Sequence, residues 1–340
     1  MSSHPSTDQG PAKDERFLDS ALRPSTWDEY VGQETIKNNL KILLRAAKER
    51  AHPPEHLLFY GPPGLGKTTL AYLIAKEMAT QIKVTSGPAI EKVGDVASIL
   101  TNLSAGDILF IDEIHRLHKS IEEVLYPAME SGSLHIIIGK GPSARTIQLD
   151  LPPFTLIAAT TQAARISAPL RSRFSGGTFH MEFYTEKEIE RIINRSAKIL
   201  GVDLESTSAE EIASRSRKTP RIANHFLKRV RDYAQVHKVP LNTKSVKEAL
   251  ALLEIDELGL GTTDRKILAT MIEKFAGGPV GLSTIAAAIS EEEATIEEVN
   301  EPYLLQEGLL ERTPRGRVVT TRGYVHLGYD VPKSRQEKLL

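Results

Sequence analysis

The 340-residue chain contains no cysteine, which excludes disulfide bonds, thiolate nucleophiles and cysteine-based zinc sites. It also lacks long apolar runs: the longest, Leu70–Ala75, is far shorter than the ~18 residues that indicate a membrane-spanning helix. Residues 1–16 lack the apolar stretch of a secretory signal, so we expect a cytoplasmic protein. The net charge is −1, which neither favours nor excludes nucleic acid as a partner.

The hydrophobic pattern divides the chain into an arm and three domains. Residues 1–20 are rich in Ser, Pro, Asp and Gly without periodicity, which predicts a disordered arm. In residues 21–184, short apolar runs alternate with longer helical patterns, which predicts an α/β domain with a parallel sheet. Residues 185–257 predict a small helical domain. Residues 258–340 predict three helices and two short strands, the elements of a winged helix-turn-helix.

Local signals place several element boundaries. Thr185 and Ser208 are each followed three residues later by Glu, the spacing of a capping box, and Pro220 suits the first turn of a helix. The apolar runs predict strands at 56–60, 108–111 and 154–159. In the last domain the pattern predicts helices at 264–275, 282–289 and 293–306, then strands at 309–312 and 318–320.

One glycine-rich segment predicts a phosphate-binding loop. Gly61–Thr68 fits G-x-x-x-x-G-K-[ST], follows an apolar strand and precedes a helical run. Its glycines let backbone N–H groups turn toward phosphate oxygens, and the helix N-terminus adds partial positive charge. We expect Lys67 to reach the β- and γ-phosphates of ATP and the Thr68 hydroxyl to ligate Mg²⁺. A glycine-rich turn without a ligand is the alternative.

Two carboxylates follow the apolar strand at 108–111. We expect Asp112 to hold Mg²⁺ and Glu113 to polarise the attacking water, with a surface acidic turn as the alternative. Thr160 and Thr161 close the next strand, where a hydroxyl is able to contact the γ-phosphate or the water. His115 and His118 have the spacing of a helical metal pair, but no further ligand cluster lies near them in the sequence.

Basic residues gather in three places. Arg171 and Arg173 precede the end of the α/β domain, with a solvated basic loop as the alternative. Residues 215–231 contain seven Lys and Arg and no acid, which favours contact with phosphate or a partner. Residues 309–340 contain seven Lys and Arg against three Asp and Glu, which favours phosphate contacts that do not read sequence, although a basic tip kept for solubility is the alternative.

Together these motifs resemble the RuvB family of AAA+ ATPases, bacterial branch-migration motors for Holliday junctions. The resemblance runs from Leu22 to Gly323 and rests on several segments: LRPSTWDEYVGQ, GPPGLGKTTLA, LFIDEIHRL, GKGPSARTIQLDLPPFTLIAATT, APLRSRF and RTPRGR. It implies a P-loop AAA+ domain of α/β class, a helical lid domain and a C-terminal winged-helix domain.

The resemblance also implies roles for individual residues. Thr161 matches the first sensor position, Arg173 the arginine finger that acts on ATP of the neighbouring subunit, and Arg221 the second sensor. Asp112 and Thr68 are the implied Mg²⁺ ligands. The implied nucleotide contacts are Leu22, Arg23, Gly64, Lys67, Thr68, Thr69 and Tyr184, with Arg312 and Arg317 as the implied DNA contacts.

The partners implied are further copies of the chain in a hexameric ring, RuvA, RuvC and duplex DNA. Residues 134–149 match the hairpin through which the family docks on RuvA, and an exposed Ile136–Ile138 run is costly without a partner. A buried strand is the alternative for these isoleucines.

The function predicted is an ATP-driven DNA translocase of recombination, repair and the SOS response. An origin-recognition-like ATP switch with a winged helix is an alternative. A clamp-loader subunit is a third candidate, disfavoured because its C-terminus should be a helical collar.

Overall fold

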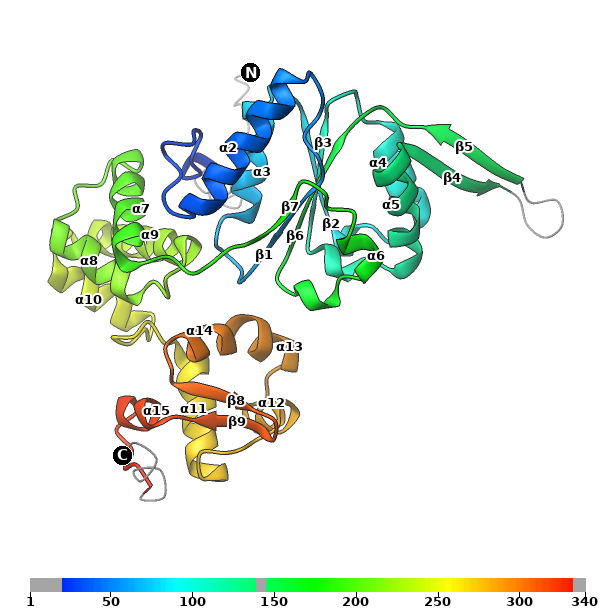
Figure 1. The fold of residues 1–340 in the computed structure, drawn as a ribbon. Helices are drawn as coiled ribbons and strands as arrows, with labels where there is room; N and C mark the ends of the chain where they lie inside the picture. The colour runs from blue at the N-terminus through cyan, green and yellow to red at the C-terminus, as the bar shows by residue number, and fades with distance from the viewer. Residues whose placement is uncertain (1–19, 139–144, 333–340) are drawn as a thin grey trace, which may run out of the picture. The chain divides into compact units, whose positions relative to one another are not determined.

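The computed structural model describes residues 20–138 and 145–332, without the side chains of residues 136–138 and 145–146. The expected disordered arm, residues 1–20, lies outside this part of the chain except for its last residue. The chain forms two compact units, shown as ribbons in Figure 1. The first holds most of the chain up to Glu182. The second holds Pro62–Leu65 and the chain from Phe183 onward, except for Lys198–Gly201. Within the described ranges, no helix is long and apolar enough to cross a membrane.

A five-stranded parallel sheet, in the order β2-β3-β6-β1-β7, organises the first unit. This confirms the predicted α/β class, and the three predicted strands differ from β1, β3 and β6 by at most one residue at either end. The strands are β1 (Leu57–Tyr60), β2 (Ile82–Ser86), β3 (Ile108–Asp112), β6 (Thr155–Thr160) and β7 (Gly177–His180). The helices are α2 (Glu34–Glu49), α3 (Lys67–Glu77), α4 (Val93–Thr101), α5 (Lys119–Ser131) and α6 (Ala168–Arg171), with short 3₁₀ turns η1 (Gly87–Ala89), η2 (Ile114–Arg116) and η4 (Ala163–Arg165).

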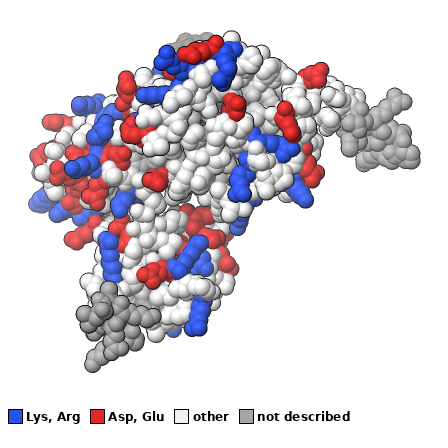
Figure 2. All heavy atoms as spheres, in the orientation of Figure 1, with Lys and Arg blue, Asp and Glu red and all other residues white. Residues whose placement is uncertain are grey.

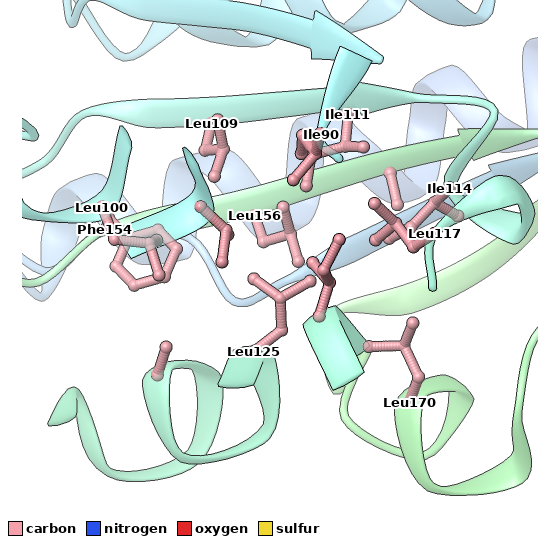
Figure 3. Packing of buried hydrophobic residues seen from close by; sticks show 14 of the residues in the cluster. Ile90, Leu100, Leu109, Ile111, Ile114, Leu117, Leu125, Phe154, Leu156 and Leu170 are labelled. Atoms are coloured by element: carbon pink, nitrogen blue, oxygen red, sulfur yellow. The ribbon is translucent and has the colours of Figure 1, made fainter. Parts of the chain in front are cut away.

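Helices cover both faces of this sheet, and its central strands are buried and apolar except at their ends. Figure 3 shows Leu109 of β3 and Leu156 of β6 on the face that packs toward Leu125 of α5. Successive side chains alternate between faces, so Phe110 and Ile157 are buried on the other side. Burial of such side chains contributes about 2 kcal/mol each. The strand ends that carry polar groups are therefore held on a rigid support.

A separate hairpin leaves this unit beside α5, as Figure 1 shows. Strands β4 (Ser133–Ile138) and β5 (Arg145–Asp150) pair antiparallel, which matches the predicted hairpin. Leu134 is buried, whereas Ile147 and Leu149 are exposed on β5. The side chains of residues 136–138 lie outside the described part, so neither interpretation of the isoleucine run is tested there.

The helical part of the second unit consists of α7 (Glu186–Ile199), α8 (Ser206–Arg215), α9 (Pro220–His237) and α10 (Thr243–Leu252). The capping box at Thr185 is confirmed: its backbone N–H donates to Glu188, and its hydroxyl accepts from the Glu188 N–H. The prediction that Pro220 begins a helix is also confirmed. The capping box at Ser208 is wrong. Helix α8 begins two residues earlier, and the Ser208 hydroxyl donates instead to the carbonyl of Leu241.

The rest of the second unit is a winged helix built as predicted from three helical segments and a hairpin. The helices are α11 (Thr262–Phe275), α12 (Leu282–Ile289), then α13 (Glu293–Thr295), η5 (Ile296–Asn300) and α14 (Glu301–Gln306) in succession. Strands β8 (Leu310–Thr313) and β9 (Gly316–Val319) and helix α15 (Thr321–His326) follow. The predicted helix at 293–306 has the right extent, but its middle, η5, is a π-helix. The missing N–H of Pro302 at the start of α14 leaves one helical hydrogen bond unmade there.

Candidate functional site

Glycine is required at each end of the phosphate loop that joins β1 to α3. Gly61 has φ +140°, and a Cβ there would lie 2.4 Å from the Met181 carbonyl oxygen. Gly66 has φ +100° and precedes the first residue of α3. Lys67 is buried, and its Nζ donates to the Gly61 carbonyl at 2.8 Å, so the side chain folds back over the loop. Thr68 and Thr69 follow in the first turn of α3, both half-buried.

The sheet order brings the other predicted groups to the same edge. All five strands are parallel, so their carboxyl ends lie together, and β6 separates β3 from β1. The Gly61 N–H donates to the Thr160 carbonyl at 3.2 Å, which ties the loop to the end of β6. Asp112 ends β3, and its Oδ1 accepts the Glu113 N–H at 3.0 Å. Loop, threonines and carboxylates thus share one edge of the sheet.

Glu113 is held by polar neighbours on this edge. Its Oε2 accepts from the N–H and hydroxyl of Thr161 at 3.2 and 3.1 Å, and His115 Nδ1 lies 3.2 Å away. Burial by itself raises the pKa of Glu113, but hydrogen bonds from His115 and Thr161 outweigh it and hold the pKa below its ordinary value. The carboxylate is therefore ionised at neutral pH and oriented toward Thr161.

His115 is a member of this cluster that the sequence did not assign. Its side chain is 3% exposed, and Nδ1 lies 2.9 Å from the Thr160 hydroxyl as well as near Glu113. His118 instead is exposed and precedes the first turn of α5. The metal-pair hypothesis assumed one continuous helix, but η2 ends before His118. In the described ranges no group of three or more His, Asp and Glu is placed to hold a metal.

The residues of the edge fit Mg²⁺ and a triphosphate. The loop has φ above zero at Gly61, Gly64 and Gly66, a backbone conformation that glycine adopts without strain and that lets N–H groups turn toward an anion. Thr68 and Asp112 offer the oxygen ligands that Mg²⁺ prefers.

Two predicted nucleotide residues lie with Gly64 in the second unit. The Arg221 N–H donates to the Gly64 carbonyl at 3.4 Å. The Tyr184 hydroxyl donates to the Leu65 carbonyl at 3.0 Å, and its ring is buried. A Cβ added to Gly64 would lie 2.7 Å from the Thr219 methyl group. The start of α9 therefore packs directly on the middle of the phosphate loop.

Leu22 and Arg23, two of the predicted nucleotide contacts, precede the first large helix, α2. Leu22 is 2% exposed, and the Arg23 guanidinium lies over the ring of Tyr72 on α3, 5.5 Å from its centre. Both residues thus belong to the unit whose helix α3 begins at the phosphate loop.

Arg173 lies just after α6, away from the groups gathered on the edge. Within the described residues it donates to the Pro169 carbonyl and to Glu130, at 2.7 and 2.8 Å, and its guanidinium stacks over Tyr126. The sequence did not identify Glu130 or Tyr126 as its neighbours. Its contacts within the chain are thus with its own loop and α5.

The basic run at 215–231 was expected to face phosphate or a partner. The structure gives several of its side chains acidic partners in the same unit. Arg215 pairs with Glu211, Arg217 with Asp264, Lys218 with Glu307, and Arg229 and Arg231 with Asp232. Glu211 and Asp232 flank the run in the sequence, whereas Asp264 and Glu307 come from the winged helix, and the sequence pattern did not reveal those two.

Arg312 and Arg317, the predicted DNA contacts, are cross-strand neighbours in the wing. Both guanidinium groups are hydrogen-bonded to the carboxylate of Glu301, Arg312 at 2.9 and 2.7 Å and Arg317 at 2.9 and 3.2 Å. The Arg312 side chain remains 51% exposed, whereas that of Arg317 is only 17% exposed. Figure 2 shows acidic side chains beside basic ones on this part of the surface. The arginines are thus anchored, and Arg312 is the more accessible.

Three family models match successive parts of this chain. The Holliday junction DNA helicase RuvB P-loop domain matches residues 22–181, the RuvB AAA lid domain 184–256, and the RuvB C-terminal winged helix domain 257–328. Among solved structures, the Thermotoga maritima RuvB Holliday junction branch migration motor is 51% identical, covers 92% of this chain and 100% of its own, and superposes with a TM-score of 0.85. A variant of the same protein, also 51% identical, covers 92% of this chain and 99% of its own with a TM-score of 0.85.

Proposed function

Because this chain belongs to the RuvB family of Holliday junction DNA helicases, we propose that it is an ATP-driven translocase that moves the branch point of four-way DNA junctions. The observation that carries this proposal is the carboxyl edge of the sheet, where the phosphate loop, Asp112, Glu113 and Thr161 lie together. A winged helix in the same chain supplies a means of holding DNA.

The residues of the edge divide the chemistry among them. Lys67 and the loop N–H groups bind the phosphates, and Thr68 and Asp112 would hold Mg²⁺, which would neutralise charge that develops on the phosphate oxygens. Glu113 is ionised and positioned by Thr161, so it is ready to orient and polarise the attacking water. The pocket for the base and ribose is formed by Leu22 and Arg23.

Hydrolysis is completed between two copies of the chain. Arg173 bonds to its own Pro169 and Glu130. We assign it to the ATP of the neighbouring subunit, where a guanidinium stabilises the charge that develops during phosphoryl transfer. Tyr184 and Arg221 contact the nucleotide bound by their own chain, from the side of the lid. The assembly expected is a homo-hexameric ring.

The ring acts on duplex DNA with protein partners. Arg312, with Arg317 behind it, contacts phosphates without reading sequence. Residues 134–149 dock on RuvA, and the exposed Ile147 and Leu149 supply apolar surface for that contact. RuvC is a further partner of the complex. We place the protein in the cytoplasm, in recombination, DNA repair and the SOS response.

Mixed rings test the shared site. Arg173→Ala and Lys67→Ala each disable a different half of the interface, so mixing the two inactive proteins should recover part of the ATPase activity. Arg171→Ala removes an exposed arginine two residues away and serves as the matched control, with activity near that of the unmodified chain. Native mass spectrometry verifies that mixed rings form. If they form without any recovery, Arg173 does not act between subunits.

A second assay separates a motor from an ATP switch. A labelled synthetic four-way junction is incubated with the protein, RuvA and ATP, and the separation of its arms is followed over time. A motor moves the branch point on any sequence. Sequence-selective duplex binding without strand movement would instead favour the switch.

A further inference from the structure

Five consecutive residues, Arg217–Arg221, form what we name the coupling segment, which follows α8 and includes the first two residues of α9. Arg217 and Lys218 both have φ +51°. This left-handed conformation is unfavourable for residues other than glycine, and two in succession persist only where surrounding contacts hold them. The contacts that do so come from two sides.

The first side is the phosphate loop. The Arg221 N–H donates to the Gly64 carbonyl at 3.4 Å, and the Thr219 methyl group fills the space beside Gly64. The Lys218 carbonyl accepts the Tyr184 N–H at 3.0 Å, and Tyr184 in turn donates its hydroxyl to Leu65. Any change in the position of the loop therefore displaces this segment directly.

The second side is the winged helix. The Arg217 guanidinium donates to both oxygens of Asp264 at 3.2 and 3.4 Å and lies 4.7 Å from the centre of the Tyr303 ring. It also donates to the Val299 carbonyl at 3.2 Å. Lys218 Nζ lies 2.7 Å from Glu307 Oε1. The Asp264 side chain is only 2% exposed, so Arg217 is the charge that balances a buried carboxylate.

These contacts allow little relative movement between the phosphate loop and the winged helix. Four peptide steps span at most about 14 Å when fully extended, and here the chain is bent by two left-handed residues. The charged side chains of Arg217 and Lys218 bind two separate parts of the winged helix, the start of α11 and the end of α14. The winged helix therefore cannot rotate about a single contact with the coupling segment.

We propose that Arg217 and Lys218 are positioning residues that transmit movement of the phosphate loop to the winged helix. The lid and winged helix then move together, and the change in nucleotide state displaces the DNA-holding wing. This inference rests on the proposed motor function and adds to it the path by which hydrolysis is coupled to DNA movement.

The test compares two sets of glycine variants. Glycine adopts the left-handed backbone without strain, so Arg217→Gly with Lys218→Gly removes the side-chain contacts without forcing a new backbone conformation. Lys238→Gly is the matched control, an exposed lysine at the other end of α9 with φ +53°. The distance that the branch point moves for each ATP hydrolysed is measured on a synthetic junction with RuvA. Dividing by ATP hydrolysed removes any change in turnover.

The double variant should lower this ratio at least fivefold while duplex binding stays within twofold of the unmodified chain. The Lys238→Gly control should leave the ratio unchanged. A ratio lowered less than fivefold overturns the proposal. If the unmodified chain hydrolyses ATP but moves no junction, the motor function itself fails, and that outcome is distinct from a defect confined to the variants.

If the double variant folds poorly, a cross-link between the Lys218 and Glu307 positions tests the same proposal. The chain has no cysteine, so Lys218→Cys with Glu307→Cys introduces its only thiols. The reduced protein should show the lowered ratio, and a short bis-maleimide between the two thiols, added before RuvA, should restore it at least threefold. A structural role alone predicts a change in thermal stability without that rescue. A reduced protein with a normal ratio, or a cross-linked one without rescue, overturns the proposal.

Discussion

Glu113 in the first unit and Glu301 in the second are both carboxylates whose pKa is lowered although burial alone raises it. Their partners differ. Glu113 is held by the N–H and hydroxyl of Thr161 and by His115, whereas Glu301 is held by two guanidinium groups. Their exposure also differs, since the Glu113 side chain is 31% exposed and that of Glu301 is 1% exposed.

We interpret this difference as one of role: Glu113 is a group that takes part in the reaction, and Glu301 is a group that stabilises the fold. A half-exposed carboxylate that accepts from a hydroxyl and an N–H exchanges these partners for water at small cost, because each such hydrogen bond contributes about 1 kcal/mol net. A buried carboxylate between two arginines does not, because leaving buried charges unpaired costs several kcal/mol. We therefore expect Glu113 substitutions to change rate and Glu301 substitutions to change stability.

The largest effect is expected from Glu113→Gln. The amide cannot polarise the attacking water, so kcat for ATP should fall about 10²- to 10⁴-fold while ATP binding is retained. Steady-state kinetics and nucleotide binding measure the two parameters. Glu123→Gln, an exposed acid on α5, is the control and should leave both unchanged. A kcat within fivefold of the unmodified chain would contradict the role of Glu113.

Glu301→Ala is expected to lower stability without changing the basal ATPase rate. It leaves Arg317 half-buried without its carboxylate, so the free energy of unfolding of the second unit should fall by about 3 kcal/mol. Urea denaturation measures the change. Glu311→Ala, an exposed acid on β8, should cost less than about 0.5 kcal/mol. A loss below 1 kcal/mol for Glu301→Ala would show that the arginines find other partners.

The hydrogen bonds of Glu301 to two arginines also predict that the free energy of unfolding depends on pH. Hydrogen bonds from Arg312 and Arg317 outweigh burial and lower the pKa of Glu301 in the folded chain. Its contribution to stability is therefore complete above the unfolded-state pKa of about 4.3 and is lost as pH falls through the lower folded-state value. The difference in unfolding free energy between the unmodified chain and Glu301→Gln should be constant near pH 6 and shrink toward pH 3. A difference that does not shrink would rule out this linkage.

The smallest effect is expected from His115→Ala. It removes one of the neighbours of Glu113 and leaves Thr161 in place, so kcat should fall about fivefold, equivalent to roughly 1 kcal/mol. KM for ATP should not change, because His115 contacts Glu113 and Thr160 and not the phosphate loop. His118→Ala, three residues away and exposed, is the control. A changed KM with a constant kcat would place His115 in nucleotide binding instead.

Local sequence signals predicted much of the fold. The strand–loop–helix around Lys67, the helix start at Pro220 and the order of the winged helix all depend on backbone preferences of neighbouring residues, and the structure agrees with them. Ser208 shows the limit of this reasoning. Its spacing to Glu211 suits a cap, but packing of α8 moved the helix start and turned its hydroxyl to Leu241.

The ion-pair partners of these charged residues could not be predicted from their neighbours in the sequence. The run around Arg217 contains no acid, so the sequence suggested an external partner, whereas Asp264 and Glu307 come from the winged helix. Likewise helix α14 and a turn separate Glu301 from Arg312, and no spacing rule joins them. His115 was weighed as a metal ligand because helical periodicity was assumed where a 3₁₀ turn ends.

By itself the sequence determined which chemistry this protein carries, because a phosphate loop and paired carboxylates after buried strands need residue types at fixed spacing along one chain. The tertiary structure decided which charges are available and which are engaged, because that depends on groups brought together from distant segments. Arg217 and Arg317 are engaged by buried carboxylates, while Arg312 keeps half of its side chain in solvent.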